Sequence, residues 1–254
     1  MASLLRPEGF PAQVGALMST RSGGASARPW DRLNLSAGTG DAVEAVERNR
    51  RAWAHATGAT PVYLRQVHGC RVVRLTGCDT APAALMHEAD ASLATEPGIA
   101  CTVLVADCLP VLFAAPEGRA VAAAHAGWRG LAGGVVESAL GALCEAACCD
   151  PTDVHVWLGA CIGPRRFEVS ADVLRAFGAD AAAPDQRRFA RRADTPAAKW
   201  LANLPLLARD RLAAAGVRAV SGGTWCTVED ASRFFSFRRD GVTGRMAASI
   251  WIRP

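Results

Sequence analysis

Three apolar runs with short breaks between them constrain the fold of this chain more than any other feature. They cover Ile99–Ala106, Val111–Ala115 and Ala120–His125. Short continuous apolar runs that end at turn residues are typical of central strands that are buried on both faces. Asp107 and Pro110 interrupt the longest apolar stretch, so we expect two core strands there rather than a membrane span.

Helix-like and strand-like segments alternate along the rest of the chain. Helices are expected over residues 42–57, 130–149, 171–177 and 200–215. Further strands are expected over residues 154–158, 218–221 and 246–251, and a hairpin is expected over residues 62–67 and 71–75. This alternation predicts an α/β or layered α+β fold in which mixed central sheets are flanked by helices.

Local signals add detail to this outline. Asp41 and Glu44 have the spacing of a capping box, which predicts that Asp41 caps the first helix. Residues 179–198 are rich in Ala, Asp, Arg and Pro, so they are the candidate for a mobile loop. No internal repeat or linker divides the sequence, and we expect a single domain over residues 1–254.

The charge of the chain does not indicate a polyanionic partner. The formal net charge is +4, and the basic residues are dispersed except near residues 187–192. We therefore expect a small-molecule substrate, with no nucleic-acid or membrane partner; the sequence does not indicate an oligomeric state. Lys199 is the single lysine among the 28 basic residues, so an anion pocket in this protein has to be built from arginine.

The cysteines bear on the cellular compartment. The chain has nine of them, an odd number, scattered through apolar stretches. Residues 1–11 contain no apolar signal region, which predicts a reducing, cytoplasmic location without a disulfide framework. We expect most of the nine to be buried as small hydrophobic side chains.

Three segments carry the side chains best suited to chemistry. They are residues 65–69 with His68, residues 106–110 with Cys108, and residues 124–130 with His125. Each places one metal-ligand type at the expected end of a strand, before a Gly or Pro turn. Two imidazoles and one thiolate suit Zn²⁺, and three protein ligands leave the open position of a catalytic site. Taken singly, each residue is more often structural, and spacings of 40 and 17 residues match no local zinc pattern.

Ordered motifs along most of the chain resemble the bacterial YfiH-like family, also called laccase-domain, polyphenol oxidase or purine nucleoside phosphorylase proteins. The matching segments are residues 19–24 (STRSGG), 34–35, 40–41, 49–50, 66–69 (QVHG), 106–108 (ADC), 125–130 (HAGWRG), 159–164 (GACIGP), 235–240 (FSFRRD) and 244–245. This chain departs from the usual pattern at Met18, at residues 36–37, and at Phe237, where Tyr is common.

The resemblance implies a YfiH-like fold and assigns the zinc ligands. By it, His68, Cys108 and His125 hold the metal, and none of the departures removes a ligand. Asp107 lies beside the cysteine ligand, where it is the candidate to orient a ligand or to move a proton. Cys161, next to a Gly-Pro turn, is interpreted as a buried turn residue rather than a nucleophile.

Arginines are the candidates for binding an anionic substrate group. Arg21 follows an expected strand and precedes two glycines, so its guanidinium can hold phosphate or carboxylate with two hydrogen bonds. Arg129 and Arg238 have the same potential, and Gln66 is a further candidate for substrate contact. For each arginine the alternative is a surface salt bridge.

The resemblance implies a zinc enzyme that acts on purine nucleosides. The expected reactions are phosphorolysis of adenosine to adenine and ribose 1-phosphate, deamination of adenosine to inosine, and phosphorolysis of methylthioadenosine. An open zinc position suits deamination, because zinc-bound hydroxide attacks C6 of the purine. Phosphorolysis instead needs an anion pocket, for which Arg21 is the candidate.

Other functions stay open at this point. An amidohydrolase that removes Ser from a UDP-muramyl peptidoglycan precursor would use the same residues. A copper phenol oxidase ranks last among the enzymes, because the usual multicopper site needs more imidazoles than the five histidines present. A structural zinc site would need a fourth protein ligand, which Cys70 can supply.

Overall fold

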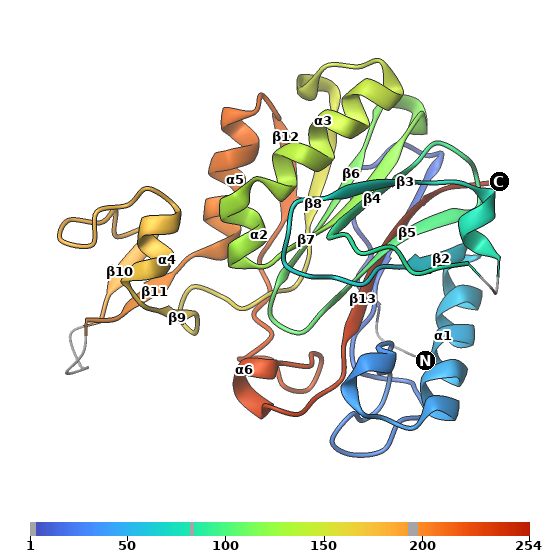
Figure 1. Ribbon diagram of the computed structural model, residues 1–254, viewed down its shortest axis with the longest axis horizontal. Coiled ribbons are helices and arrows are strands. Elements are labelled where there is room, and N and C mark those ends of the chain that lie inside the picture. Colours follow the sequence, from blue (N-terminus) through green and yellow to red (C-terminus); the bar gives the residue numbers. More distant parts are fainter. Residues whose placement is uncertain (1–3, 82–83, 193–197) are drawn as a thin grey trace.

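Two β-sheets pack face to face between layers of helices in the computed structural model, which describes residues 4–81, 84–192 and 198–254 (Figure 1). The helices are α1 (Val43–Thr57), α2 (Trp128–Gly133), α3 (Val135–Ala147), α4 (Ala171–Ala176), α5 (Leu204–Ala214) and α6 (Phe237–Asp240). Helices α2, α3 and α5 pack on the outer face of one sheet, and α1 packs on the outer face of the other. This arrangement confirms the predicted layered, mixed α/β class.

The smaller of the two sheets has four strands. Their order is β1 (Val14–Met18), β13 (Met246–Ile252), β5 (Ile99–Val105) and β2 (Thr60–Tyr63). Strand β13 runs antiparallel to β1 and β5, whereas β2 is parallel to β5. The two central strands are almost entirely apolar because the other sheet covers one face and α1 covers the other, and their polar residues Thr102 and Ser249 hydrogen-bond to each other.

The larger sheet has six strands and is also mixed. Their order is β12 (Ala219–Gly222), β8 (His155–Leu158), β6 (Leu109–Ala114), β7 (Val121–Ala126), β4 (Ala91–Ala94) and β3 (Val72–Leu75). The outer pairs β12–β8 and β3–β4 are parallel, and the inner pairs are antiparallel. A third, small sheet of β10 (Phe189–Arg191), β11 (Trp200–Ala202) and β9 (Glu168–Val169) projects beside α4, at the left of Figure 1.

Strand β6 shows how one apolar run serves two cores. Val111 and Phe113 pack toward the helices, while Leu112 and Ala114 pack toward the four-stranded sheet. All four side chains are fully buried. The three apolar runs of the sequence are therefore confirmed as central strands β5, β6 and β7, with both faces covered.

The predicted hairpin over residues 62–67 and 71–75 is wrong. Strand β2 pairs with β5 in the four-stranded sheet, whereas β3 pairs with β4 in the six-stranded sheet. The segment between β2 and β3 is thus a crossover from one sheet to the other. The strand predicted over residues 71–75 is confirmed as β3, whereas the strand predicted over residues 62–67 overlaps β2 only at residues 62–63. The partners of both strands lie far away in the sequence.

Other boundaries differ for local reasons. The predicted helix over residues 130–149 is two helices, because Gly134 adopts a left-handed φ of 103° between α2 and α3. The predicted helix over residues 200–215 begins only at Leu204, after β11. Asp41 does not cap α1: the N-cap is Ala42, and the Asp41 carboxylate accepts hydrogen bonds from Asn34 and the Ala42 N–H. The other predicted helices and strands are present within two residues of their predicted ends.

The expectations for the loop over residues 179–198 and for the cysteines are confirmed only in part. The candidate mobile loop over residues 179–198 contains β10, and its residues 193–197 lie outside the described residues. All nine cysteines are free thiols, but only Cys101 and Cys161 are buried, so the expectation that most are buried is wrong. In the described part of the chain, no helix has the length and apolar character needed to cross a membrane.

Candidate metal centre

Two crossovers between the sheets and one strand end bring the three expected ligands together. His68 lies on the crossover from β2 to β3, and Cys108 lies on the crossover from β5 to β6. His125 is near the end of β7, next to β6 in the six-stranded sheet. The site therefore sits where the chain passes twice from one sheet to the other.

The ligand atoms of His68, Cys108 and His125 all lie within 4.8 Å of one another. The Cys108 Sγ is 3.9 Å from His68 Nε2, and the two imidazole ring centres are 4.9 Å apart. His68 has a φ of 62°, a conformation that costs energy for a residue with a Cβ and that persists when its surroundings fix it. This cluster can hold a metal ion.

Asp90, which the sequence analysis did not single out, orients both histidines. Its carboxylate is fully buried and accepts hydrogen bonds from the backbone N–H groups of Val67, His68 and Gly69, at 2.7–3.0 Å. Its Oδ1 also pairs with His125 Nδ1 at 2.8 Å, which leaves Nε2 of that ring as the ligand atom. A carboxylate behind a ligating histidine is the usual support of a metal site, because it fixes the tautomer and the ring orientation.

Electrostatics in the cluster favour the metal-binding form of the thiol. Burial would raise the pKa of Cys108, but the neighbouring His125 and His68 lower it to about 6. Burial would lower the pKa of His125, but Cys108 and Asp90 raise it to about 9. The thiol is thus largely a thiolate at neutral pH, and the thiolate is the form that binds metals.

Gly127 leaves the space in which the ligands meet. A Cβ on this residue would lie 2.8 Å from His68 Cδ2 and 3.1 Å from Cys108 Sγ. Gly127→Ala is therefore expected to push the two ligands apart and to weaken metal binding by about tenfold or more, the size of effect seen when ligand support is disturbed. Metal affinity measured by calorimetry or by competition with a chelating dye checks this.

The matched control is Gly141→Ala in α3, where a new Cβ meets no atom within 4 Å. It should leave metal affinity unchanged, and a helical Gly→Ala change stabilises a protein by up to about 1 kcal/mol. Equal metal affinities for the two variants would contradict the role of Gly127.

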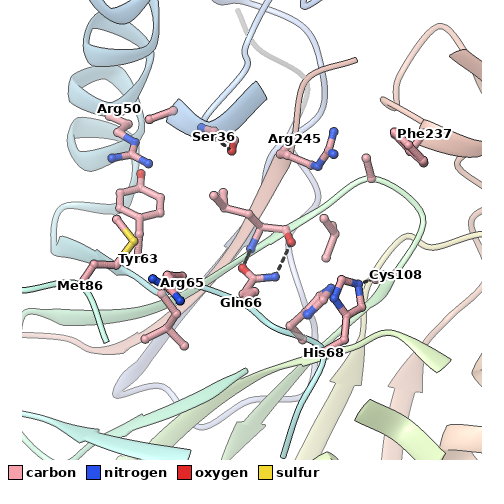
Figure 2. Close-up of a pocket in the computed structure, with 17 residues that line it drawn as sticks. Ser36, Arg50, Tyr63, Arg65, Gln66, His68, Met86, Cys108, Phe237 and Arg245 are labelled. Atoms are coloured by element: carbon pink, nitrogen blue, oxygen red, sulfur yellow. Dashed lines mark hydrogen bonds between the residues drawn. The ribbon is translucent and has the colours of Figure 1, made fainter. Parts of the chain in front are cut away.

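A pocket of about 520 Å³ opens onto the cluster (Figure 2). His68 and Cys108 lie at one end of it, and Arg50, Tyr63 and Met86 lie at the other. Its charged lining, among the described residues, consists of arginines and the ligand histidines, with no Asp or Glu. The pocket is thus suited to a small molecule that carries an anionic group.

Arg245 and Arg50 supply fixed positive charge to this pocket. Arg245 is half-buried, burial lowers its pKa, and its Nη1 donates to the carbonyls of Thr243 and Gly244. Arg50 donates through Nε to the Leu35 carbonyl at 3.0 Å and stacks 4.1 Å above the Tyr63 ring. Neither arginine was a candidate in the sequence, although both belong to the matched motifs NR and GR.

Tyr63 is the other pocket residue that the sequence analysis missed. Its hydroxyl is buried and has no hydrogen-bond partner among the described residues. Burial raises the pKa of this phenol above its usual value, so it stays protonated and able to donate. It is the single tyrosine of the chain, which is the one signal that would have drawn attention to it.

The predicted polar contacts Gln66 and Asp107 are both near the cluster but already engaged. The Gln66 amide lines the pocket and pairs with the backbone N–H and C=O of Leu104, at 2.8 and 2.9 Å (Figure 2). Asp107 accepts from the Thr227 hydroxyl at 2.6 Å and from the Arg238 backbone N–H at 2.7 Å. Asp107 faces a second, smaller cavity rather than the large pocket.

The three predicted arginines lie outside the large pocket. Arg21 lines a separate polar hollow, where it pairs with Asp31 and stacks on Phe235. Arg129 is exposed and stacks on Trp128. Arg238 borders the smaller cavity and donates to the Glu168 carbonyl. The structure therefore does not bring Arg21 or Arg129 to the metal cluster.

Cys161 is fully buried, as expected for a turn residue. Its backbone pairs with that of Cys226 in an isolated parallel β-bridge, and burial raises the pKa of its free thiol well above the usual value. A protonated, inaccessible thiol is a poor nucleophile.

The fold and the site define a mixed α/β protein with a cluster of two histidines and one cysteine that can hold a metal ion. The chain belongs to the family described as multi-copper polyphenol oxidoreductase laccase, whose model matches residues 15–253. Purine nucleoside phosphorylase YfiH of Escherichia coli is 45% identical over 99% of this chain and 100% of its own. A purine nucleoside phosphorylase of Pseudomonas aeruginosa is 46% identical over 96% of this chain and 95% of its own.

Solved structures agree with this assignment. A Neisseria meningitidis protein superposes with a TM-score of 0.88 at 42% identity and covers 99% of both chains. YlmD from Geobacillus stearothermophilus gives a TM-score of 0.88 at 31% identity, over 99% of this chain and 96% of its own. These matches confirm the resemblance to YfiH-like proteins.

Proposed function

We propose that this protein is a zinc-dependent purine nucleoside phosphorylase. The observation that carries the proposal is a cationic pocket that opens directly onto His68, Cys108 and His125. The names of relatives at 45–46% identity supply the substrate class. No Asp or Glu among the described residues lines the pocket, so it is suited to phosphate as the second substrate.

The donor set favours zinc over copper. Two imidazoles and one thiolate are ligands that zinc prefers, and a fourth position is left for water or substrate. Bound there, zinc would supply Lewis-acid polarisation and would lower the pKa of a coordinated water to roughly 7. The described residues contain one cluster of three or more potential metal ligands, whereas a multicopper oxidase needs several.

In the proposed reaction, the bond between C1′ and N9 of adenosine breaks and a phosphate oxygen bonds to C1′. The proton of hydrogen phosphate ends on the departing base, which gives adenine and ribose 1-phosphate. The contribution of Arg245 and Arg50 is to bind phosphate and hold it in line with C1′.

Arg245→Ala is expected to raise the KM for phosphate about tenfold to a hundredfold, the value of one charge-assisted hydrogen bond. Zinc content should stay unchanged, because Arg245 is not a ligand. Steady-state kinetics at varied phosphate concentration check this. Arg74→Ala is the control, since Arg74 is an exposed residue of β3 that bonds to Thr95.

Arg21→Ala, measured in the same series, tests whether phosphate binds at Arg21, as expected from the sequence, or at Arg245, as proposed here. A raised KM for phosphate in Arg21→Ala, with an unchanged KM in Arg245→Ala, would indicate that phosphate binds at Arg21 instead. The position of Arg21 beside Asp31, outside the pocket, favours the opposite result.

A product assay by mass spectrometry tests the proposed function itself. Purified zinc-loaded protein is given adenosine or methylthioadenosine, with and without phosphate, and separately a Ser-linked UDP-muramyl precursor. Adenine that forms only with phosphate supports phosphorolysis, and inosine shows deamination at the same centre. Free Ser without any adenine would replace the proposal by an amidohydrolase.

A further inference from the structure

A second cavity, of about 160 Å³, adjoins the large pocket at Cys108. The two share Ala106, Cys108 and Phe237, so one member of the metal cluster borders both cavities. The smaller cavity is lined by residues of several separate elements: Ala106, Asp107, Cys108, Gly127, Trp128, Ile162, Phe167, Leu204, Phe237 and Arg238. The site is therefore two-chambered.

Aromatic side chains dominate the smaller chamber. Trp128 opens α2, Phe167 precedes β9, and Phe237 opens α6, so three distant segments each present a ring. A cavity of about 150 Å³ lined by apolar side chains can hold one benzene-sized molecule, and whole-ligand pockets begin at about 300 Å³. The smaller chamber is thus sized for one planar ring system and not for an entire nucleoside.

One carboxylate, that of Asp107, lies at the edge of this chamber. Each carboxylate oxygen of Asp107 accepts one hydrogen bond from the protein, from Thr227 and from the Arg238 N–H, and each retains further acceptor capacity. Asp107 holds a φ of 104°, a conformation that its surroundings maintain. An acceptor at the edge of an aromatic slot matches a heterocycle that carries an amino group.

We propose that the smaller chamber is the subsite for the purine base, and that the ribose and phosphate occupy the large cationic pocket. This inference rests on the proposed function. Trp128, Phe167 and Phe237 surround the base, and Asp107 accepts a hydrogen bond from its exocyclic amino group. The sugar then lies where the two cavities meet at Cys108, which places the bond between sugar and base beside the metal cluster.

Separate binding of the two product halves tests the assignment. Equilibrium titrations of the zinc-loaded protein with adenine alone and with ribose 1-phosphate alone are compared for Trp128→Leu, Phe237→Leu and Arg245→Ala. Loss of a stacking ring is expected to weaken adenine binding about tenfold, in line with the value of one base–aromatic contact. Trp128→Leu should bind ribose 1-phosphate within twofold of the parent. Phe237→Leu, whose side chain borders both cavities, should lose more affinity for adenine than for ribose 1-phosphate, and Arg245→Ala should show the reverse pattern.

Phe237→Leu keeps the test decisive if Trp128→Leu folds poorly, because the Phe237 side chain is 57% exposed and its loss leaves the core intact. Asp107→Asn adds a readout that a purely structural role would not move. The amide that replaces the carboxylate can donate as well as accept, so it should discriminate less between adenosine and inosine. The ratio of their kcat/KM values should fall about tenfold, which corresponds to the loss of one hydrogen bond.

Unchanged adenine affinity in both leucine variants, or an equal loss of ribose 1-phosphate affinity, would overturn the base subsite. The proposed function can fail separately. A parent protein that binds adenine through these rings but releases no adenine from adenosine and phosphate would keep the subsite and remove the phosphorylase.

Discussion

Cys108→Ala is expected to abolish stoichiometric zinc binding and catalytic turnover while the chain stays folded. Cys108 supplies the single thiol of the cluster, and its loss leaves His68 and His125 as the remaining members of that cluster among the described residues. Disturbing a residue that merely supports a ligand costs about tenfold to a hundredfold in affinity, so removal of a ligand should cost at least that much. Elemental analysis, zinc titration and thermal unfolding of the purified variant check the three parts of this expectation.

Cys70→Ala is the matched control for this experiment. The Cys70 thiol bonds to the Gly130 carbonyl at 3.5 Å and is not a member of the ligand cluster. A three-ligand catalytic site predicts that Cys70→Ala keeps its zinc. Loss of zinc from Cys70→Ala would instead indicate a fourth protein ligand and a structural metal, and full zinc content in Cys108→Ala would remove the assigned centre altogether.

The parts of the fold that the sequence predicted are those with local causes. A run such as Ile99–Val105 is apolar at all positions but Thr102 because both of its faces are covered, so its pattern identifies a central strand without knowledge of its neighbours. Pairing depends instead on contacts distant in sequence. Thus Val62 and Val73, only eleven residues apart, lie in strands of different sheets, which no local pattern indicates.

The same distinction between local patterns and long-range contacts explains which residues of the candidate site could be predicted from the sequence. The ligands were recognisable because His and Cys beside turn glycines or proline are chemically conspicuous, and the family motifs added to that. The arginines that line the large pocket were not recognisable, because an arginine's role depends on where its guanidinium is held. Arg21 is neutralised by Asp31 at 3.4 Å, whereas Arg50 and Arg245 are fixed to backbone carbonyls at the pocket wall. In a chain with 28 basic residues, composition cannot make that choice.

Asp90→Asn is expected to have the largest effect on stability of the changes considered. The wild-type carboxylate accepts four hydrogen bonds, two on each oxygen, from Val67, His68, Gly69 and His125. An amide has one acceptor oxygen, so two buried donors would face an NH₂ group. At about 1–3 kcal/mol for each unsatisfied buried donor, the free energy of unfolding should fall by about 2–6 kcal/mol.

Metal binding should weaken in Asp90→Asn as well, by about tenfold to a hundredfold, because His125 loses the carboxylate that sets its tautomer. Glu88→Gln is the control, since Glu88 is a half-exposed carboxylate two residues earlier, paired with Arg65 in a surface salt bridge. That pair contributes at most about 1 kcal/mol, and metal affinity should not change. Chemical denaturation of the metal-free proteins and zinc titration of the folded ones measure the two effects independently.

The pH dependence of the Asp90→Asn effect follows from the pKa of the wild-type carboxyl. Burial would raise that pKa, but hydrogen bonds from His125 and from the Gly69 and Val67 N–H groups lower it below the usual 3.8. A lowered pKa in the folded state stabilises the fold above the unfolded-state value, and this stabilisation is lost as the pH falls through the folded-state pKa. The stability difference between wild type and Asp90→Asn should therefore be full at pH 5–8 and should shrink below about pH 4. A difference that stays constant into strong acid would show that the charge on Asp90 does not hold the crossover in place.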